Sequence, residues 1–294
     1  MDRAVYVIVL NWNGRHVIAS CLASLADVVD PPLEIIVVDN ASSDGSPEIV
    51  RRDFPGLELI TNERNLLFAE GNNVGLRRAI ARGADRIILL NNDTEVDPSF
   101  ASRMVGALER DPKAGIVGPK ILYGGDSKRI WYGGGGFYPV VWIPRHDHIR
   151  RLDGTFPERG GETLWVSGCA MLIRTKVIDA IGLLDPSYTI YCEDVDFCLR
   201  ARASGWKCLY EPGALVRHKV SSSSGGGMTP FKLENRLVST VTLIRRFKPP
   251  WWRVLMAPVH GAGFMLLALV LLLSGRFALF RGALRGAARV ARGR

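Results

Sequence analysis

Cysteine is scarce in this 294-residue sequence, and its five cysteines form no motif. The count is odd and no CxxC pair occurs. The sequence therefore argues against a disulfide scaffold and a zinc ribbon, and reduced thiols in the cytoplasm are the simplest interpretation. The cysteines are Cys21, Cys169, Cys192, Cys198 and Cys208.

Two nucleotide-binding motifs are also missing. The first apolar run is followed by Asn-Trp-Asn-Gly-Arg at residues 11–15, where a Rossmann dinucleotide site needs GxGxxG. No GxxxxGK[ST] sequence of a P-loop occurs. A Rossmann oxidoreductase and a P-loop enzyme are therefore set aside. The first apolar run, Val5–Leu10, is too short for the core of a signal peptide, and we expect none.

Acidic residues are absent from the last fifty positions. Residues 245–294 hold ten Lys or Arg and no Asp or Glu, and the remainder holds 28 basic and 29 acidic residues. The net charge of +9 thus belongs to the tail, which argues against a nucleic-acid partner and fits an anionic lipid surface. We expect a main domain at 1–244 and a membrane-associated helical tail at 245–294.

The tail contains one long apolar run. Val254–Leu273 has twenty residues without a charge, although a proline and a histidine interrupt it, and this length matches about one bilayer span. Arg281, Arg285 and Arg289 then recur at helical spacing, as in a helix that lies at a membrane interface. A single crossing, two interfacial or re-entrant helices, and a helix pair packed on the domain all remain open.

The main domain alternates short apolar runs with longer amphipathic ones. Continuous Val, Ile and Leu runs suit strands that are buried on both faces, with helices as crossovers. This pattern predicts an α/β fold with an open, mostly parallel sheet flanked by helices. The expected strands are Val5–Leu10, Glu34–Asp39, Leu57–Ile60, Arg86–Leu90, Gly115–Val117, Trp165–Ile173 and Lys207–Tyr210, and the expected helices are His16–Ala26, Pro47–Asp53, Glu70–Arg82, Pro98–Arg110 and Glu193–Ser204.

The segment 123–161 is rich in glycine, aromatic residues and charge. It predicts loops or an irregular hairpin over a ligand crevice. Its basic part, Arg145–Arg151, is either a contact for an acceptor phosphate or a solvated loop. The Ser- and Gly-rich run at 221–227 is expected to be flexible.

Polar residues directly follow three of the expected strands. Asn11, Asp39-Asn40 and Asn91-Asn92-Asp93 occupy these positions. Ligands of open α/β sheets bind beyond the carboxyl ends of the strands, so these clusters should converge on one crevice. Asp39 could accept the imide N–H of a uracil or thymine base.

Two acidic positions allow either a ligand or a structural role. Asp44 could contact the ligand or cap the following helix. Asp93 could hold Mg²⁺ or Mn²⁺ against a diphosphate, with His218 as a second ligand. A single histidine is also compatible with a structural role.

Three acids, Glu193, Asp194 and Asp196, begin one expected helix. Clustered carboxyl groups raise one another's pKa, which suits proton abstraction, although a helix N-terminus also stabilises acids. We expect Asp194 to be the catalytic base, with Glu193 beside it.

In this order the motifs resemble the family 2 glycosyltransferases, and most closely their rhamnosyltransferase-like branch. The resemblance covers roughly residues 5–224. It rests on Val38-Asp39-Asn40, Ser43-Asp44-Gly45, the run Asn65-Leu66-Leu67-Phe68-Ala69-Glu70-Gly71-Asn72-Asn73-Val74-Gly75, Asn91-Asn92-Asp93, Gly168-Cys169-Ala170-Met171, Glu193-Asp194-Val195-Asp196 and His218.

The resemblance implies a GT-A fold, a divalent metal, and single-displacement transfer with inversion at the anomeric carbon. It assigns Asp39 to base recognition, Asp93 and His218 to the metal, and Asp194 to the catalytic base. The sequence departs from the family at Asn91, which replaces the first Asp of the DxD-type motif and offers the metal a weaker ligand. The expected contacts to the donor nucleotide are Asn11, Asp39, Asn40, Asp44, Asn72, Asn73 and Asn91, where the asparagines at 72 and 73 could instead cap a helix.

The family branch favours dTDP-rhamnose as the donor, and a UDP-sugar is the alternative. The apolar tail suggests a polyprenyl-linked glycan acceptor at the cytoplasmic face of the cell membrane, in cell-wall or surface-polysaccharide assembly. A homo-oligomer is compatible with the sequence. The rival interpretation is a non-catalytic membrane-bound scaffold that kept the fold.

Overall fold

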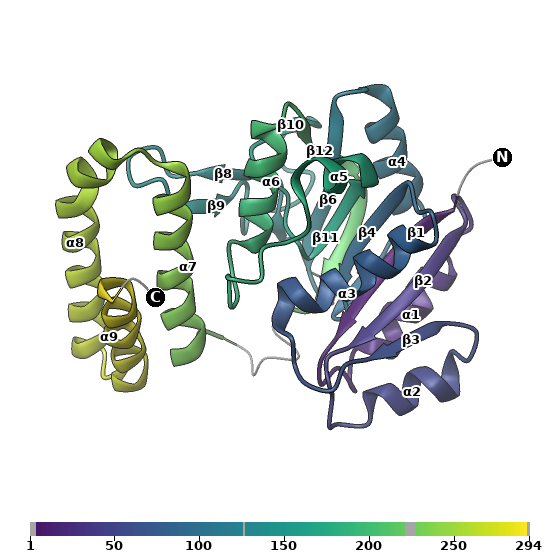
Figure 1. Ribbon diagram of the computed structural model, residues 1–294, viewed down its shortest axis with the longest axis horizontal. Helices are drawn as coiled ribbons and strands as arrows, with labels where there is room; N and C mark the ends of the chain where they lie inside the picture. The colour runs from purple at the N-terminus through teal and green to yellow at the C-terminus, as the bar shows by residue number, and fades with distance from the viewer. Residues whose placement is uncertain (1–3, 126, 221–226, 293–294) are drawn as a thin grey trace.

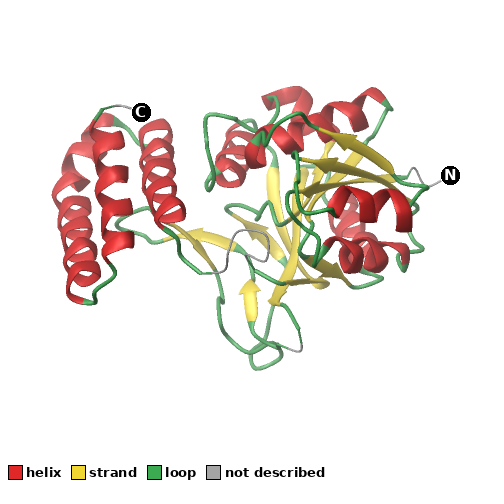
Figure 2. Cartoon of the chain, turned by 90° about the horizontal axis from the view of Figure 1, so that it is seen from below, coloured by secondary structure: helices red, strands yellow, loops and turns green. Residues whose placement is uncertain are grey.

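The computed structural model describes residues 4–125, 127–220 and 227–292. They form an α/β body and a unit of three helices beside it (Figures 1 and 2). The strands are β1 (Val5–Asn11), β2 (Leu33–Asp39), β3 (Glu58–Thr61), β4 (Arg86–Asn91), β5 (Thr94–Val96), β6 (Ala114–Tyr123), β7 (Ile130–Tyr132), β8 (Gly135–Phe137), β9 (Pro144–His146), β10 (Gly161–Thr163), β11 (Ala170–Arg174) and β12 (Lys207–His218).

The main sheet has the strand order β10-β12-β6-β11-β4-β1-β2-β3, with β5 on β12 and β7 on β6. β1 runs parallel to β2 and β4, while β11 is antiparallel to β4 and β6. The mostly parallel sheet is therefore confirmed. The helices are α1 (Ile18–Ala26), α2 (Ser46–Asp53), α3 (Leu67–Ala81), α4 (Phe100–Arg110), α5 (Thr175–Ile181), α6 (Glu193–Ala203), α7 (Pro230–Phe247), α8 (Pro250–Leu273) and α9 (Phe277–Ala291).

The core lies along the central strands, which carry the continuous apolar runs. Val7–Val9 of β1 and Ile87–Leu89 of β4 are fully buried. A strand in the middle of a sheet covered by helices has no solvent face, so both sets of alternating side chains are apolar. This burial fixes β1, β2 and β4 side by side and places their carboxyl ends at one edge of the sheet.

Several strand boundaries differ from the expectation. The strand expected at Trp165–Ile173 begins only at Ala170, and the one expected at Lys207–Tyr210 continues to His218 through an irregularity near Glu211–Leu215. The three-residue strands β5, β7 and β10 were not predicted. β8 and β9 pair as an antiparallel hairpin, which confirms the hairpin alternative for the segment 123–161.

All five cysteines are buried, and none forms a disulfide with another described residue. The flexible stretch expected at 221–227 falls outside the described residues, apart from Gly227.

The last three helices pack mainly on one another. Leu233 of α7, Leu271 of α8 and Ala283 of α9 form a small apolar core, and Glu234 of α7 pairs with Arg285 at 2.8 Å. The expected boundary between the main domain and the tail, at residue 245, falls inside α7, which begins at Pro230. The boundary stays a prediction. In the described part of the chain, one helix, α8, is long and apolar enough to cross a membrane. Only 6% of its most apolar stretch is buried against the rest of the protein.

A tight helix–sheet contact provides a test of the fold. A Cβ at Gly75 of α3 would lie 2.4 Å from Cγ2 of Ile8 in β1. Gly75→Ala should lower the free energy of unfolding by about 1–3 kcal/mol because Ile8 is stiff and fully packed. A Cβ at Gly106 of α4 would meet only an arginine nitrogen, at 3.5 Å. Gly106→Ala should therefore raise the free energy of unfolding by up to about 1 kcal/mol through the higher helix propensity of alanine. Urea denaturation measures both, and a change of equal sign in the two variants would contradict the packing.

Candidate active site

An amide and carboxylate network lies at the carboxyl ends of β1, β2 and β4. Nδ2 of Asn11 donates to Oδ1 of Asp39 at 2.7 Å, and Nδ2 of Asn92 donates to Oδ1 of Asn11 at 2.7 Å. All three side chains are buried. Gly14 leaves the space that this network needs, since a Cβ there would lie 2.2 Å from Nδ2 of Asn92. The three polar strand ends therefore converge as expected.

The carboxylate of Asp39 is held by local donors. Its Oδ1 also accepts the Ser42 hydroxyl at 2.6 Å, and its Oδ2 accepts the Ser42 N–H at 2.9 Å. A carboxylate has about four acceptor positions, so one on Oδ2 stays free for a ligand. Asn40 next to it donates to the carbonyl of Leu67 and accepts from Asn62, which ties β2 to the start of α3.

Asp44 organises the turn before α2. Its Oδ1 accepts the N–H and hydroxyl of Ser46, and its Oδ2 accepts the N–H of Arg15 at 2.7 Å. Partial burial raises the pKa of Asp44, but these hydrogen bonds outweigh it and leave the pKa below its usual value. The structure thus gives Asp44 a turn-forming role at the rim of the network.

Asp93 and His218 form the second part of the site. The pairing of β5 with β12 places His218 opposite Thr94, directly after Asp93. Nε2 of His218 lies 3.0 Å from Oδ1 of Asp93, but without the alignment of a hydrogen bond. Oδ1 of Asp93 and Nδ1 of His218 are both buried and unpaired within the described residues. A buried acceptor without a donor costs free energy of folding. A ligand that bonds these two atoms would therefore be bound favourably.

The pair fits part of a divalent metal site. Ligands at about 2.1 Å from an octahedral ion and at right angles stand about 3 Å apart, which matches the observed spacing. The described residues contain no cluster of three or more His, Cys, Asp or Glu that could hold a metal. Magnesium is commonly bound by one or two carboxylates together with substrate phosphates and water. Asp93 and His218 could therefore hold an ion only together with the diphosphate of a ligand.

The first turn of α6 provides the third part of the site. Oδ2 of Asp194 accepts the N–H of Gly168 at 2.9 Å, and the glycine permits this approach because a Cβ would lie 2.9 Å from the Phe68 ring. Burial raises the pKa of Asp194, although backbone hydrogen bonds oppose the rise. Burial and the neighbouring Asp194 carboxylate raise the pKa of Glu193 to about 8. Oε2 of Glu193 has no partner among the described residues.

The thiol of Cys169 connects the two acidic centres. Burial raises its pKa well above the usual value, and the carboxylates of Asp93 and Asp194 both add to the rise. Asp93 and Asp194 therefore both lie within electrostatic range of this one side chain. This common neighbour is consistent with the expectation that the predicted metal ligand and the predicted base belong to one site.

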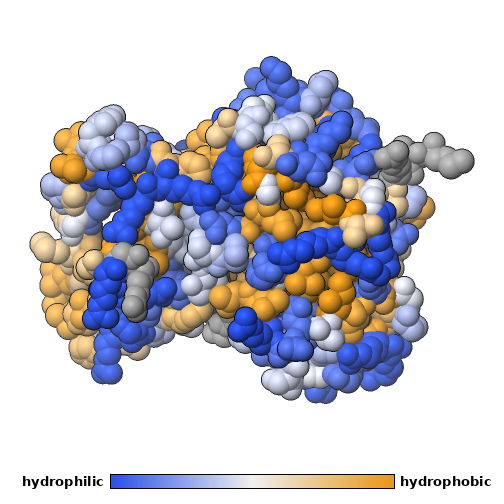
Figure 3. All heavy atoms as spheres, viewed as in Figure 1, coloured by the Kyte–Doolittle hydropathy of each residue, from blue (hydrophilic) through white to orange (hydrophobic). Residues whose placement is uncertain are grey.

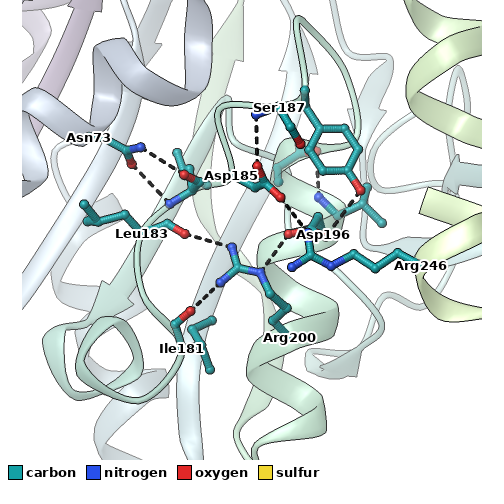
Figure 4. A network of polar contacts seen from close by, with 12 residues as sticks. Asn73, Ile181, Leu183, Asp185, Ser187, Asp196, Arg200 and Arg246 are labelled. Atoms are coloured by element: carbon teal, nitrogen blue, oxygen red, sulfur yellow. Dashed lines mark hydrogen bonds and ion pairs between the residues drawn. The ribbon is translucent and has the colours of Figure 1, made fainter. Parts of the chain in front are cut away.

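Asp196 anchors α6 rather than facing a ligand. It is fully buried, and Nε of Arg200 lies 2.7 Å from its Oδ2 while Arg246 of α7 lies 3.0 Å from its Oδ1 (Figure 4). Arg200 also donates to the carbonyls of Ile181 and Leu183. This network fixes the loop before α6 and joins α6 to the helical unit, so it holds Glu193 and Asp194 in place.

The asparagines of α3 do not cap that helix. Both lie inside it: Nδ2 of Asn72 donates to the carbonyl of Phe68, and the amide of Asn73 bonds both the N–H and the carbonyl of Leu184 (Figure 4). Asn73 therefore supports the loop at 181–187. Asn91 ends β4, and its carbonyl accepts the Thr94 hydroxyl, which closes the tight turn that presents Asp93.

Three residues near the site were not singled out by the sequence. The ring of Trp131 packs edge-on against His218 and His146, with centroid distances of 4.6 and 4.5 Å. Burial lowers the pKa of His146 to about 4, so this ring is neutral. Arg236 of α7 is exposed and forms no hydrogen bond or ion pair with a described residue. Burial raises the pKa of the nearby Tyr191, and the charge of Arg236 opposes part of that rise. The aromatic cluster in 123–161 was a usable signal for Trp131, whereas nothing local marked Arg236.

Comparisons with known proteins identify the family and the fold of the chain. A family model described as glycosyl transferase family 2 matches residues 6–182. The chain is 27% identical to the N-acetylglucosaminyl-diphospho-decaprenol L-rhamnosyltransferase of Mycobacterium tuberculosis, over 86% of this chain and 88% of that protein. It is 21% identical to the dTDP-rhamnosyl transferase RfbF of Shigella flexneri, over 76% of this chain and 72% of the relative.

Two solved structures share the fold. GalNAc-T7 with UDP, GalNAc and Mn²⁺ has a TM-score of 0.61 and 17% identity, covering 82% of this chain and 47% of that one. The mannosyltransferase PcManGT from Pyrobaculum calidifontis with GDP-Man and Mn²⁺ has a TM-score of 0.59 and 18% identity, covering 98% and 75%. These likenesses confirm the expected GT-A fold.

The buried Glu193 predicts a dependence of stability on pH. The unfolded chain releases this proton near pH 4.5 and the folded chain near pH 8, so the folded state binds more protons between these values. The free energy of unfolding should therefore fall as the pH rises through this window, by roughly 1 kcal/mol per pH unit from this group. Glu193→Gln should remove that fall and be the more stable protein at pH 8. Urea titrations at several pH values measure it, and Glu63→Gln, at an exposed glutamate, is the control. Parallel profiles for Glu193→Gln and the wild type would contradict a buried neutral acid.

Proposed function

Because this chain belongs to glycosyl transferase family 2, we propose that it transfers L-rhamnose from dTDP-rhamnose to a hydroxyl of a lipid-linked glycan. The proposal takes its donor and acceptor from the two rhamnosyltransferase relatives, which it matches over most of its length. A UDP-sugar is the alternative donor. The proposal depends most on the buried pair of Asp93 and His218. Their side chains lie 3.0 Å apart, yet Oδ1 of Asp93 and Nδ1 of His218 have no hydrogen-bond partner among the described residues.

The donor binds at the carboxyl ends of β1, β2 and β4. An acceptor position on Asp39 takes the imide N–H of the base, and the Asn11 and Asn92 amides hold that carboxylate in place. Asn40 and Asp44 shape the loops around this position, and Asn91 shapes the turn before Asp93. Asn72 and Asn73 act indirectly, since their amides bond the backbone.

Asp93 and His218 are the residues that would hold a divalent cation together with the donor diphosphate. That ion would offset the negative charge on the leaving nucleotide diphosphate. The lack of a hydrogen-bond partner for Oδ1 of Asp93 among the described residues and the 3.0 Å spacing to Nε2 of His218 support this assignment.

Asp194 acts as the base. Its carboxylate removes the proton from the acceptor hydroxyl as the oxygen attacks the anomeric carbon, and the bond from that carbon to the nucleotide diphosphate breaks on the opposite side. The sugar is transferred with inversion and the proton stays on Asp194. A pKa raised by burial suits this step near neutral pH. Glu193 is the weaker candidate, because a pKa of about 8 leaves it mostly protonated there.

The helical unit brings the enzyme to its acceptor at the cytoplasmic face of the membrane. The relative in Mycobacterium tuberculosis is named for a decaprenol-linked acceptor, and α8 is long and apolar enough to enter a bilayer. The charge of Arg236, which no described residue pairs and which acts on Tyr191 in the loop before α6, is suited to the diphosphate of such an acceptor.

Calorimetric titration with dTDP, UDP and GDP, each with and without Mn²⁺, tests the donor site. We expect dTDP to bind, and to bind at least about tenfold more tightly with the metal, because a cation held by Asp93 and His218 would offset the charge of the diphosphate. Asp93→Asn should abolish the metal-dependent part, and Asp27→Asn, at an exposed carboxylate, should not. Metal-independent binding of equal strength in all three proteins would remove the assigned metal site.

Transfer assays with dTDP-rhamnose and a polyprenyl-diphosphate-linked glycan test the base. Asp194→Asn should lower kcat by about 10²–10⁴-fold and leave dTDP affinity unchanged, because the base acts on the acceptor. Turnover at the wild-type rate in this variant would refute the assignment. No nucleotide binding by the folded wild-type protein would favour the scaffold interpretation.

A further inference from the structure

The apolar helix α8 is fixed to the transferase body near its middle. A ring nitrogen of His260 lies 2.9 Å from the carbonyl oxygen of Val141, in the turn between β8 and β9. The ammonium group of Lys248, just before α8, lies 4.2 Å from the ring centroid of Trp142 in the same turn. α8 is the outermost helix, on the far side of α7 from the sheet, and the β8–β9 hairpin reaches toward it (Figure 1).

This tether is incompatible with a bilayer crossing by α8. Twenty-four residues of helix are about 36 Å long, so His260 would lie near the centre of the hydrocarbon. The turn around Val141 would then lie at the same depth, where irregular backbone exposed to lipid is not tolerated. α9 turns back along α8, and Phe280 packs against the small core that contains Leu271 of α8. A crossing by α8 would therefore carry Arg281 and Arg285 into the hydrocarbon as well.

The outward surface of α8 is apolar along its whole length, and the turn of the hairpin extends it. Tyr138 and Val140 in that turn are 53% and 63% exposed. Figure 3 shows hydrophobic residues along the outer flank of the helical unit. The exposed apolar residues of α8 are Trp251, Val254, Leu255, Val259, Met265, Leu266, Leu269, Val270, Leu272 and Leu273.

The charge beside this surface indicates its partner. The last fifty residues hold ten cations and no acid, and Arg276 and Arg281 after α8 are exposed. A protein partner or a second copy of this chain would have to supply a large acidic surface, whereas an anionic bilayer offers negative headgroups around an apolar layer.

We propose that α8 lies flat in the interface of an anionic lipid bilayer, with Tyr138 and Val140 of the β8–β9 turn as a second point of insertion. Both ends of α8 then stay on the side of the membrane that carries the active site. The inference rests on the proposed function, since it explains how a lipid-linked acceptor reaches the site. The hairpin that inserts also carries His146, whose ring packs on Trp131 beside His218.

Vesicle flotation of the full chain tests the surface. Vesicles of phosphatidylcholine with about 30% phosphatidylglycerol should bind the wild type, and pure phosphatidylcholine should bind it several-fold less. Val140→Glu should lower binding to the anionic vesicles several-fold, because it places a charge in the inserted turn. Val29→Glu, at a valine that is 85% exposed on the body, is the matched control and should bind normally. Equal binding of both variants, or a dimer that Val140→Glu disperses without any vesicle binding, would overturn the proposal.

Cysteine labelling from each side of the membrane tests the orientation. The five native cysteines are buried, so a new surface cysteine dominates the reaction with a membrane-impermeant maleimide. Ser274→Cys, in the turn after α8, and Val29→Cys should be labelled on the same face in inside-out and right-side-out vesicles. Labelling on opposite faces would show that α8 crosses the bilayer. Neither assay needs turnover, so metal-dependent dTDP binding by a chain that fails them would leave the proposed function standing.

Discussion

The pairing of β12 with β5 is the constraint on which the candidate site depends. It places His218, from the end of the α/β body, opposite Thr94 and next to Asp93, which is 125 positions earlier in the chain. The resulting pair is buried yet lacks the hydrogen bonds that a closed polar contact would have. A fold that keeps two such groups unsatisfied gains by binding a ligand there. The strand ends of β1 and β2 and the first turn of α6 contribute the groups around it.

The same principle separates supporting residues from reactive ones. Asn11, Asn73 and Asp196 are buried, and their polar atoms have partners that hold strand ends, a loop and a helix in position. Asp93 and Glu193 are buried with an oxygen left unpaired among the described residues. Polar groups of the first kind determine the shape of the site, and those of the second kind are available for its chemistry. This distinction is visible only in three dimensions.

The fold and the strand-end cluster could be predicted from the sequence because both follow from local patterns. Apolar runs mark the buried parallel strands, and the polar residues after them must meet at one edge of the sheet. The role of Asn73 could not be predicted, since its partner Leu184 is 111 positions away. The full length of β12 could not be predicted either, because Pro212 and Gly213 interrupt the alternation of side chains that marks a strand. α7 could not be assigned to the helical unit from the sequence, because its residues carry charges of both signs and so resemble those of the main domain.

The contact of α7 with α6 links the helical unit to the candidate site. Arg246 reaches Asp196 in the helix that carries Asp194, and Ser239 donates to the carbonyl of Ile190 in the preceding loop. The helical unit therefore supports the helix that carries the proposed base and the loop before it. A membrane-bound acceptor would approach along that unit.

Pulsed electron paramagnetic resonance of Mn²⁺ bound with dTDP tests the central claim most directly. The account predicts hyperfine coupling to one imidazole nitrogen and to the phosphorus of the nucleotide, with the nitrogen coupling lost in His218→Gln. A nitrogen coupling that persists in that variant, or phosphorus coupling with no nitrogen coupling in the wild type, would contradict the assignment of Asp93 and His218 as the metal-binding pair.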